Sequence, residues 1–193
     1  MSASAKSVLP LSWFKRPASQ VARDLIGSYL CSAELGARLL ITETESYPGL
    51  HDQATALHLS RRRHSEQMRS AGGVWYVYPV YGVHLMLNLV TAEAGEPQSV
   101  LIRAAFDPAA ETPKLCAGPA KLSKYLSVSK ALSGQPISPS SGLWIECGEP
   151  IKDENLSIGS RVGIDYAGAD AALPLRFGLK NHPSLSKNFS KPA

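Results

Sequence analysis

Two stretches decide the expected fold: ITETESY at residues 41–47 and VWYVYPVYGVHLMLN at residues 74–88. Both are rich in β-branched and aromatic residues, which favours β-strands. Alternate side chains of a strand share one face, so the apolar face that begins at Ala37 ends with Glu43 and Glu45. A strand that starts in the core and ends in two carboxylates either leads into a functional site or simply reaches the surface.

Residues 74–88 predict a β-hairpin, because two β-rich runs flank a turn that contains proline and glycine. Tyr76 and Tyr78 share one face of the first run, where they either complete the sheet core or line a pocket. Tyr81 lies near the tip, where a core role is harder to explain. An exposed aromatic ring on a rigid tip suits insertion into a stack of bases.

The other elements predict an α+β fold in a single domain. We expect a mostly antiparallel curved sheet with a protruding β-hairpin and a few packed helices. One helix should follow Ser19 as its cap and another should begin near Pro119, whereas residues 48–73 form a long polar connection. Further strands are expected at residues 28–32, 37–47, 99–106, 143–147, 161–165 and 174–179. The expected division is a flexible lead-in at 1–17, the domain at 18–186 and a basic tail at 187–193.

The composition is that of an ordinary soluble globular protein, with 193 residues, 44% hydrophobic and 19% charged. No apolar run approaches the roughly 18 residues that span a bilayer, and the N-terminus lacks the features of a secretory signal. The three cysteines form no CxxC pair. They therefore suggest neither a disulfide framework nor a zinc site, and they fit a reducing cytoplasm.

The basic residues are clustered, although the net charge is only +4. Residues 113–135 contain four lysines and no acid, residues 171–193 are also free of acids, and Arg61 and Arg62 belong to a run of three arginines. Lys121 and Lys124 fall on the outward face of the predicted second helix. Such clusters are typical of one positive face for a polyanion, and solvated surface charge is an equally common reading.

The chemistry is expected around two acids and one arginine. The Cα atoms of Glu43 and Glu45 should lie roughly 6.5–7 Å apart on one strand face. Two like charges that close raise the pKa of at least one of the two carboxyl groups when they are partly buried, which suits a general base or acid. Arg103 is the single charge in an apolar strand and needs a carboxylate or phosphate partner, with Glu45 as a candidate. The alternative is a strand end open to solvent. Asn88 could read a base edge, or satisfy a turn.

Residues 21–186 resemble the alkyladenine (3-methyladenine) DNA glycosylase family of base-excision repair, in its bacterial form. The resemblance rests on eight segments in the family's order and at similar spacing. They are VARDLIG from Val21, ITETESY from Ile41, WYVYPVYGVHLMLN from Trp75, VLIRA from Val100, CAGPAKL from Cys116, LWIE from Leu143, RVGIDYAG from Arg161 and LPLRF from Leu173.

The resemblance implies a role for each matching residue. Glu45 corresponds to the catalytic acid that deprotonates a water for attack on C1′ of the deoxyribose, and Arg103 to the arginine that helps to hold that water. Tyr47 and Tyr78 correspond to the rings that enclose a flipped base. The remaining assignments are Tyr81 as the residue that fills the gap in the duplex, Asn88 as the amide that disfavours guanine, and a backbone contact near Ile164.

One position departs from the family pattern. A gap-free alignment puts Ala56 where the family has a histidine that lines the base pocket and can donate a hydrogen bond to the base. The substrate range is therefore open, above all for hypoxanthine. His58 lies two residues further on and could replace the histidine if the loop is shifted.

The expected function is a monofunctional base-excision glycosylase for alkylated or deaminated purines in duplex DNA. The resemblance implies no metal or other cofactor, no membrane association, a monomeric state and a place with the nucleoid in the bacterial cytoplasm. A non-catalytic binder of damaged DNA is the second hypothesis, which Ala56 favours and an intact Glu45 opposes. A carbohydrate hydrolase that uses Glu43 and Glu45 is a third, and the basic surface opposes it.

Overall fold

The computed structural model describes residues 7–61 and 65–189. Within these ranges the strands form one eight-stranded sheet that is not closed, in which the neighbours run antiparallel in the order β3-β4-β5-β2-β1-β6, with β8 beside β2 and β7 beside β8. The expected α+β class is confirmed. The strands are β1 Tyr29–Ser32, β2 Ala37–Tyr47, β3 Trp75–Val80, β4 His84–Val90, β5 Ser99–Phe106, β6 Leu143–Glu146, β7 Leu156–Gly159 and β8 Arg176–Leu179.

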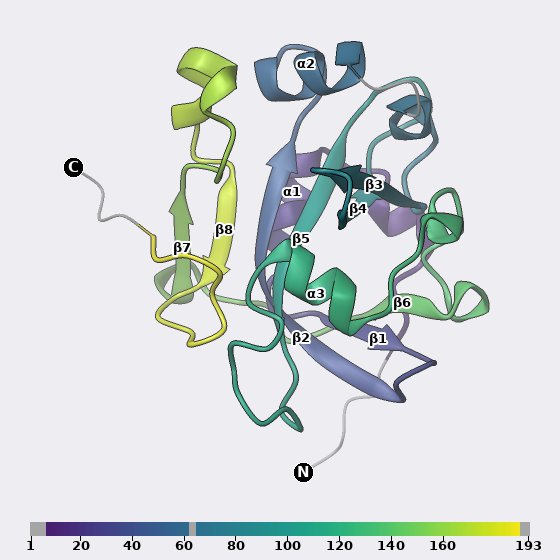
Figure 1. Ribbon diagram of the computed structural model, residues 1–193, viewed down its shortest axis with the longest axis vertical. Helices are drawn as coiled ribbons and strands as arrows, with labels where there is room; N and C mark the ends of the chain where they lie inside the picture. The colour runs from purple at the N-terminus through teal and green to yellow at the C-terminus, as the bar shows by residue number, and fades with distance from the viewer. Residues whose placement is uncertain (1–6, 62–64, 190–193) are drawn as a thin grey trace.

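Strand β2 organises the sheet because it has partners on both edges (Figure 1). Its first half pairs with β1, its second half pairs with β8, and β5 runs along the other edge. The register with β5 shifts on both sides of Glu43. The two carboxylates therefore lie inside a three-stranded segment rather than at a free edge.

The helices lie on both sides of this sheet. Figure 1 shows α1 behind the strands and α3 in front, while α2 and η6 stand together near the end of β2. The α-helices are α1 Ala18–Asp24, α2 Gln53–Arg61 and α3 Pro119–Tyr125. The 3₁₀ helices are η1 Leu11–Phe14, η2 Ser65–Arg69, η3 Lys130–Leu132, η4 Pro139–Ser141, η5 Asp153–Asn155 and η6 Asp165–Ala172.

One large apolar cluster joins the helices to the sheet. Val21 and Leu25 come from the α1 region and Leu122 from α3, and all three are fully buried against strand residues such as Trp75. Side chains of this size gain about 1.5–3 kcal/mol each on full burial. The core thus fixes β2 and β5, which carry the acids and Arg103. No helix in the described ranges has the length and apolar character to cross a membrane.

Several local predictions are wrong. The polar connection at 48–73 contains α2, whose sequence has only a narrow apolar stripe. Helix α1 begins at Ala18 after Pro17 with no side-chain cap, so Ser19 is not its cap. Residues 161–165 form no strand, and β7 precedes them instead.

Candidate active site

Glu43 and Glu45 on β2 are both fully buried and share one guanidinium. Arg103 on β5 donates a hydrogen bond from Nε to Oε1 of Glu43 at 2.8 Å, and its Nη1 lies 3.2 Å from Oε1 of Glu45. Arg176 on β8 adds a second guanidinium, with Nη1 3.2 Å from Oε1 of Glu43. Two acids thus face two arginines, which compensates the cost of burying the charges.

Glu45 has partners from three directions. Besides Arg103, its Oε1 accepts a hydrogen bond from the amide of Val162 at 2.7 Å, and its Oε2 accepts one from the hydroxyl of Tyr47 at 3.0 Å. Burial raises the pKa of Glu45 above its usual value, although the neighbouring guanidinium, amide and hydroxyl each act to lower it. A carboxylate with a raised pKa in a water-poor site suits a general base.

A second buried ion pair holds the loop that carries Val162. Arg161 and Asp52 are both fully buried and form two parallel hydrogen bonds, at 2.8 Å to Oδ2 and 2.6 Å to Oδ1. Arg161 also donates to the carbonyl oxygen of Ser46 and lies 4.9 Å from the ring centroid of Tyr47. The pair therefore ties the loop to the end of β2, beside Glu45.

An aromatic hollow adjoins Glu45 through Tyr47. Its free space is only about 30 Å³, enough for a few water molecules. The imidazole of His58 lies 4.5 Å from the ring of Tyr78, and its Nε2 lies 2.6 Å from the hydroxyl of Tyr76. In this structure the rings of His58, Tyr76 and Tyr78 lie in contact with one another. The hollow is lined by Tyr47, Ala54, Thr55, His58, Met68, Tyr76, Tyr78, Asn88, Ser99 and Tyr166.

Of the predicted pocket residues Asn88, Ala56 and Ile164, only Asn88 lines the hollow. Asn88 lines the hollow, and its Nδ2 donates to the carbonyl oxygens of Tyr76 and Met86. Ala56 is not among the lining residues, and His58, one helical turn beyond Ala54, is. Ile164 packs in a small apolar cluster with Ala54 and does not line the hollow. Near it, the backbone amide of Val162 contacts Glu45.

The tip of the β3–β4 hairpin protrudes. Tyr81 is 92% exposed and adopts a left-handed backbone conformation with φ 51°, and Val83 is 76% exposed. Lys121 and Lys124 of α3 line a hollow together with Val83. The predicted wedge and two predicted backbone contacts therefore lie on neighbouring surfaces.

The arginine cluster is described only in part. Arg61 at the end of α2 is exposed, with its guanidinium 5.9 Å from the ring of Tyr166. Arg62 lies outside the described residues. No three potential metal ligands gather anywhere in the described ranges.

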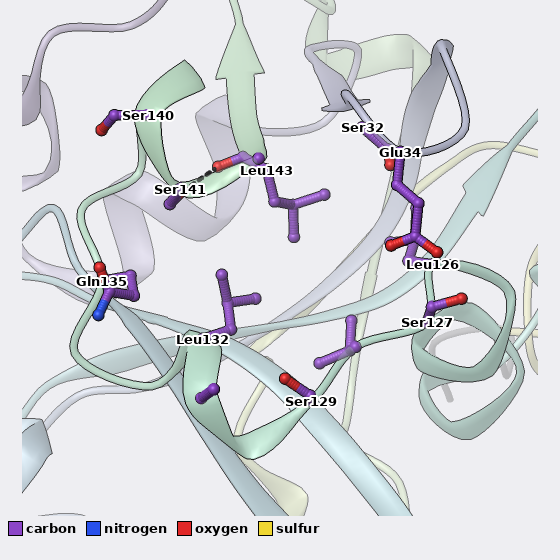
Figure 2. Close-up of a pocket in the computed structure, with 13 residues that line it drawn as sticks. Ser32, Glu34, Leu126, Ser127, Ser129, Leu132, Gln135, Ser140, Ser141 and Leu143 are labelled. Carbon is purple, nitrogen blue, oxygen red and sulfur yellow. Dashed lines mark hydrogen bonds between the residues drawn. The ribbon is translucent and has the colours of Figure 1, made fainter.

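Another hollow, of about 370 Å³, lies between the β1–β2 turn and the segment that follows α3 (Figure 2). Figure 2 shows serines and leucines along its wall and Glu34 projecting over it from the turn. Neither Glu43, Glu45 nor Arg103 lines this hollow. Its larger size does not make it the active site, because it lacks the compensated buried charges.

Comparison with known proteins decides between the candidate functions. The family model of methylpurine-DNA glycosylase matches residues 12–183. The chain belongs to the methylpurine-DNA glycosylase family. It is therefore a monofunctional DNA N-glycosylase that acts on alkylated bases, and the carbohydrate hydrolase hypothesis is wrong.

Relatives match this methylpurine-DNA glycosylase along nearly the whole chain and support the same family assignment. A protein of Psychrobacter cryohalolentis is 40% identical, with 94% of this chain and 96% of the relative covered. Proteins of Methanocella arvoryzae and Myxococcus xanthus are 38% and 37% identical, with 93% of this chain and 96% and 93% of the relatives covered. Each carries the provisional name 3-methyladenine DNA glycosylase.

Sequence reasoning missed several residues of the site. The Asp52–Arg161 pair, Arg176 and Tyr166 received no role, although three of the four fall in segments that carried the family resemblance. The sequence predicts no partner for these residues, because Asp52 pairs with Arg161 and Arg176 pairs with Glu43 across more than 100 positions. Only the fold brings them to Glu43 and Glu45.

Proposed function

We propose that this glycosylase removes 3-methyladenine from duplex DNA, with hypoxanthine and 1,N6-ethenoadenine as further substrates, and that Glu45 is the general base. One observation carries the proposal: the buried Glu45 carboxylate, fixed by Arg103 and the Val162 amide, adjoins an aromatic hollow. The exposed Tyr81 fits a wedge that takes the place of the flipped nucleotide. Lys121, Lys124 and Arg61 fit contacts with phosphates.

The proposed reaction is a hydrolysis at C1′ of the deoxyribose. The oxygen of a water attacks C1′ while Glu45 takes the proton, and the bond from C1′ to the purine nitrogen breaks with its electron pair on the leaving base. Arg103 holds the carboxylate in position and compensates part of its charge. Among the residues that the structure describes, no lysine lines the hollow to form a Schiff base with the sugar, which agrees with a monofunctional reaction.

Tyr47 makes two sets of contacts that must change when a base enters. It lines the hollow together with Tyr78, and its hydroxyl donates a hydrogen bond to Oε2 of Glu45. Because the free space is about 30 Å³, a purine can enter between Tyr47 and Tyr78 only after the side chains that line the hollow separate. We propose that this separation also opens Glu45 to the nucleophilic water, so that flipping and activation of the base occur together.

Tyr47→Phe tests this arrangement through pH dependence. The Tyr47 hydroxyl lowers the pKa of Glu45 in the free enzyme, so its loss should raise that pKa further. Glu45 works as a base only when deprotonated, and the acidic limb of kcat/KM should move to higher pH. The limb of kcat reports the enzyme–substrate complex and should stay in place. Equal movement of both limbs, or of neither, would count against the proposal.

His58 is proposed to supply the base-edge contact that Ala56 cannot make. Its imidazole is in the hollow, against Tyr78 and the hydroxyl of Tyr76. 3-Methyladenine leaves readily because it is cationic in the nucleoside, whereas neutral hypoxanthine depends more on hydrogen bonds from the pocket. His58→Ala should therefore slow hypoxanthine release about ten-fold more than 3-methyladenine release, the effect of one lost hydrogen bond.

A second variant separates the two positions. Ala56→His in the His58→Ala background should leave hypoxanthine release low, because Ala56 does not line the hollow. Single-turnover rates on matched duplexes provide the measurement. Full recovery by the added histidine would favour the gap-free alignment and defeat the role of His58.

The lesion range is tested directly with duplexes that contain one 3-methyladenine, hypoxanthine or 1,N6-ethenoadenine. Abasic sites are converted to strand breaks with alkali. The proposal predicts that the monomeric protein releases 3-methyladenine and, more slowly, hypoxanthine. DNA binding without release of any lesion would support the alternative, a binder of damaged DNA.

Bacterial relatives support a place with the nucleoid in the cytoplasm.

A further inference from the structure

The segment at residues 184–189, here called the C-terminal strap, follows β8 and lies beyond the family match, which ends at residue 183. It packs closely on the sheet. The hydroxyl of Ser184 lies 2.7 Å from that of Thr42, Leu185 is buried, and the guanidinium of Arg176 lies 3.8 Å from the ring centroid of Phe189. The strap is thus a defined part of the structure beside the two acids.

Ser186 is the residue of the strap that enters the acid cluster. Its amide donates to Oε2 of Glu43 at 2.6 Å, and its hydroxyl donates to Oε1 of Glu43 at 2.8 Å. The same hydroxyl accepts a hydrogen bond from Nη2 of Arg103 at 3.2 Å. One serine therefore bridges Glu43 and Arg103.

These contacts determine the orientation of Arg103. A guanidinium is a rigid planar fork, and here Nε is bound by Glu43 and Nη2 by Ser186. With two nitrogens held, the third, Nη1, is directed at Oε1 of Glu45. The orientation of the group that faces the proposed base is thus set from the opposite side of the cluster, by the strap.

We propose that Ser186 is a positioning residue of the active site, which acts through Glu43 and Arg103 on Glu45. This inference rests on the proposed role of Glu45 as the general base. It also assigns Glu43 a function that its sequence left open: Glu43 is the anchor for Arg103, not a second catalytic acid. The Glu43 carboxylate accepts four hydrogen bonds from described side chains and amides, and they come from Arg103, Arg176 and Ser186.

The test replaces Ser186 in the full-length chain. Ser186→Ala removes the bridging hydroxyl, with its hydrogen bonds to Glu43 and Arg103, and keeps the amide, so the single-turnover rate should fall at least about ten-fold. Ser186→Thr keeps the hydroxyl and should restore much of the rate. Ser129→Ala is the matched control, because Ser129 is exposed at the hollow of Figure 2.

A second readout separates positioning from a purely structural role. Glu45 faces Arg103 from β5, Glu43 and Tyr47 from β2, and the Val162 amide from the loop after β7. Of these, Arg103 lowers the pKa of Glu45 the most. A misdirected Arg103 lowers it less, so the acidic limb of kcat in Ser186→Ala should move to higher pH. Affinity for a duplex with an abasic-site analogue should stay unchanged.

The outcomes are distinct. If the wild type is active and Ser186→Ala has the same rate and pH profile, the positioning role is overturned and the proposed function stays intact. A lower melting temperature of Ser186→Ala with an unchanged rate overturns it as well. A wild type that binds lesion DNA but releases no base contradicts the proposed function and this inference together.

Discussion

Glu45→Gln should lower the single-turnover rate of 3-methyladenine release by roughly 10²–10⁴-fold, the usual contribution of a positioned general base. Glutamine keeps the size of the side chain and can still bind the Val162 amide, but it cannot take a proton from water. Arg103 retains Glu43 as its partner. The fold and the aromatic hollow should therefore survive the change.

Two measurements make this result specific to Glu45. Glu34→Gln removes the same charge from an exposed turn at the hollow of Figure 2 and should leave the rate unchanged. The affinity of Glu45→Gln for a duplex with an abasic-site analogue should stay within about three-fold of the wild-type value, below 1 kcal/mol. A large loss of affinity would show that Glu45 acts in binding instead of in the chemical step.

Arg161→Met should produce the largest loss of stability. Arg161 and Asp52 are both fully buried and doubly hydrogen-bonded, and removal of one partner leaves an uncompensated charge at a cost of about 3–5 kcal/mol. Lys15→Met is the control, because the pair of Lys15 and Glu93 is largely exposed and worth at most about 1 kcal/mol. Unfolding in urea measures both. Equal losses would refute the role of the buried pair.

The effect of Arg161→Met should shrink in acid. Burial acts to raise the pKa of Asp52, but the hydrogen bonds and charge of Arg161 outweigh it, so the pKa lies below its usual value. A lowered pKa contributes stability that is present above the unfolded value of about 3.9 and is lost as the pH falls through the folded value. The unfolded state binds protons alike in both proteins, so the difference in unfolding free energy between wild type and variant should narrow as the pH falls from the pKa of Asp52 in the variant, which burial without Arg161 raises, to its lowered pKa in the wild type.

The parts of the fold with strong local periodicity were predictable. The alternation in residues 37–47 and the tyrosine-rich hairpin give β2, β3 and β4 near the observed bounds. Helix α2 was missed because its apolar stripe is narrow, and tertiary contacts with η6 complete its burial. The predicted strand at 161–165 failed because its β-favouring residues serve a loop held by the Arg161–Asp52 pair.

Some residues of the candidate site were predictable one by one, but their network was not. Strand periodicity put Glu43 and Glu45 on one face, and a lone charge in an apolar strand marked Arg103. Sequence spacing could not show that Arg103 contacts both acids, nor that Ser186 closes the cluster from a distance of more than 140 residues in sequence. Such contacts depend on the pairing of β2 with both β5 and β8.

The role of Glu45 is tested most directly by the release of free base from a duplex that contains one 3-methyladenine, by wild type and Glu45→Gln at equal occupancy. Wild type should release one free base for each abasic site, with no strand break before alkali, and Glu45→Gln should release almost none. Equal release by the two proteins would contradict the assignment of Glu45 as the general base.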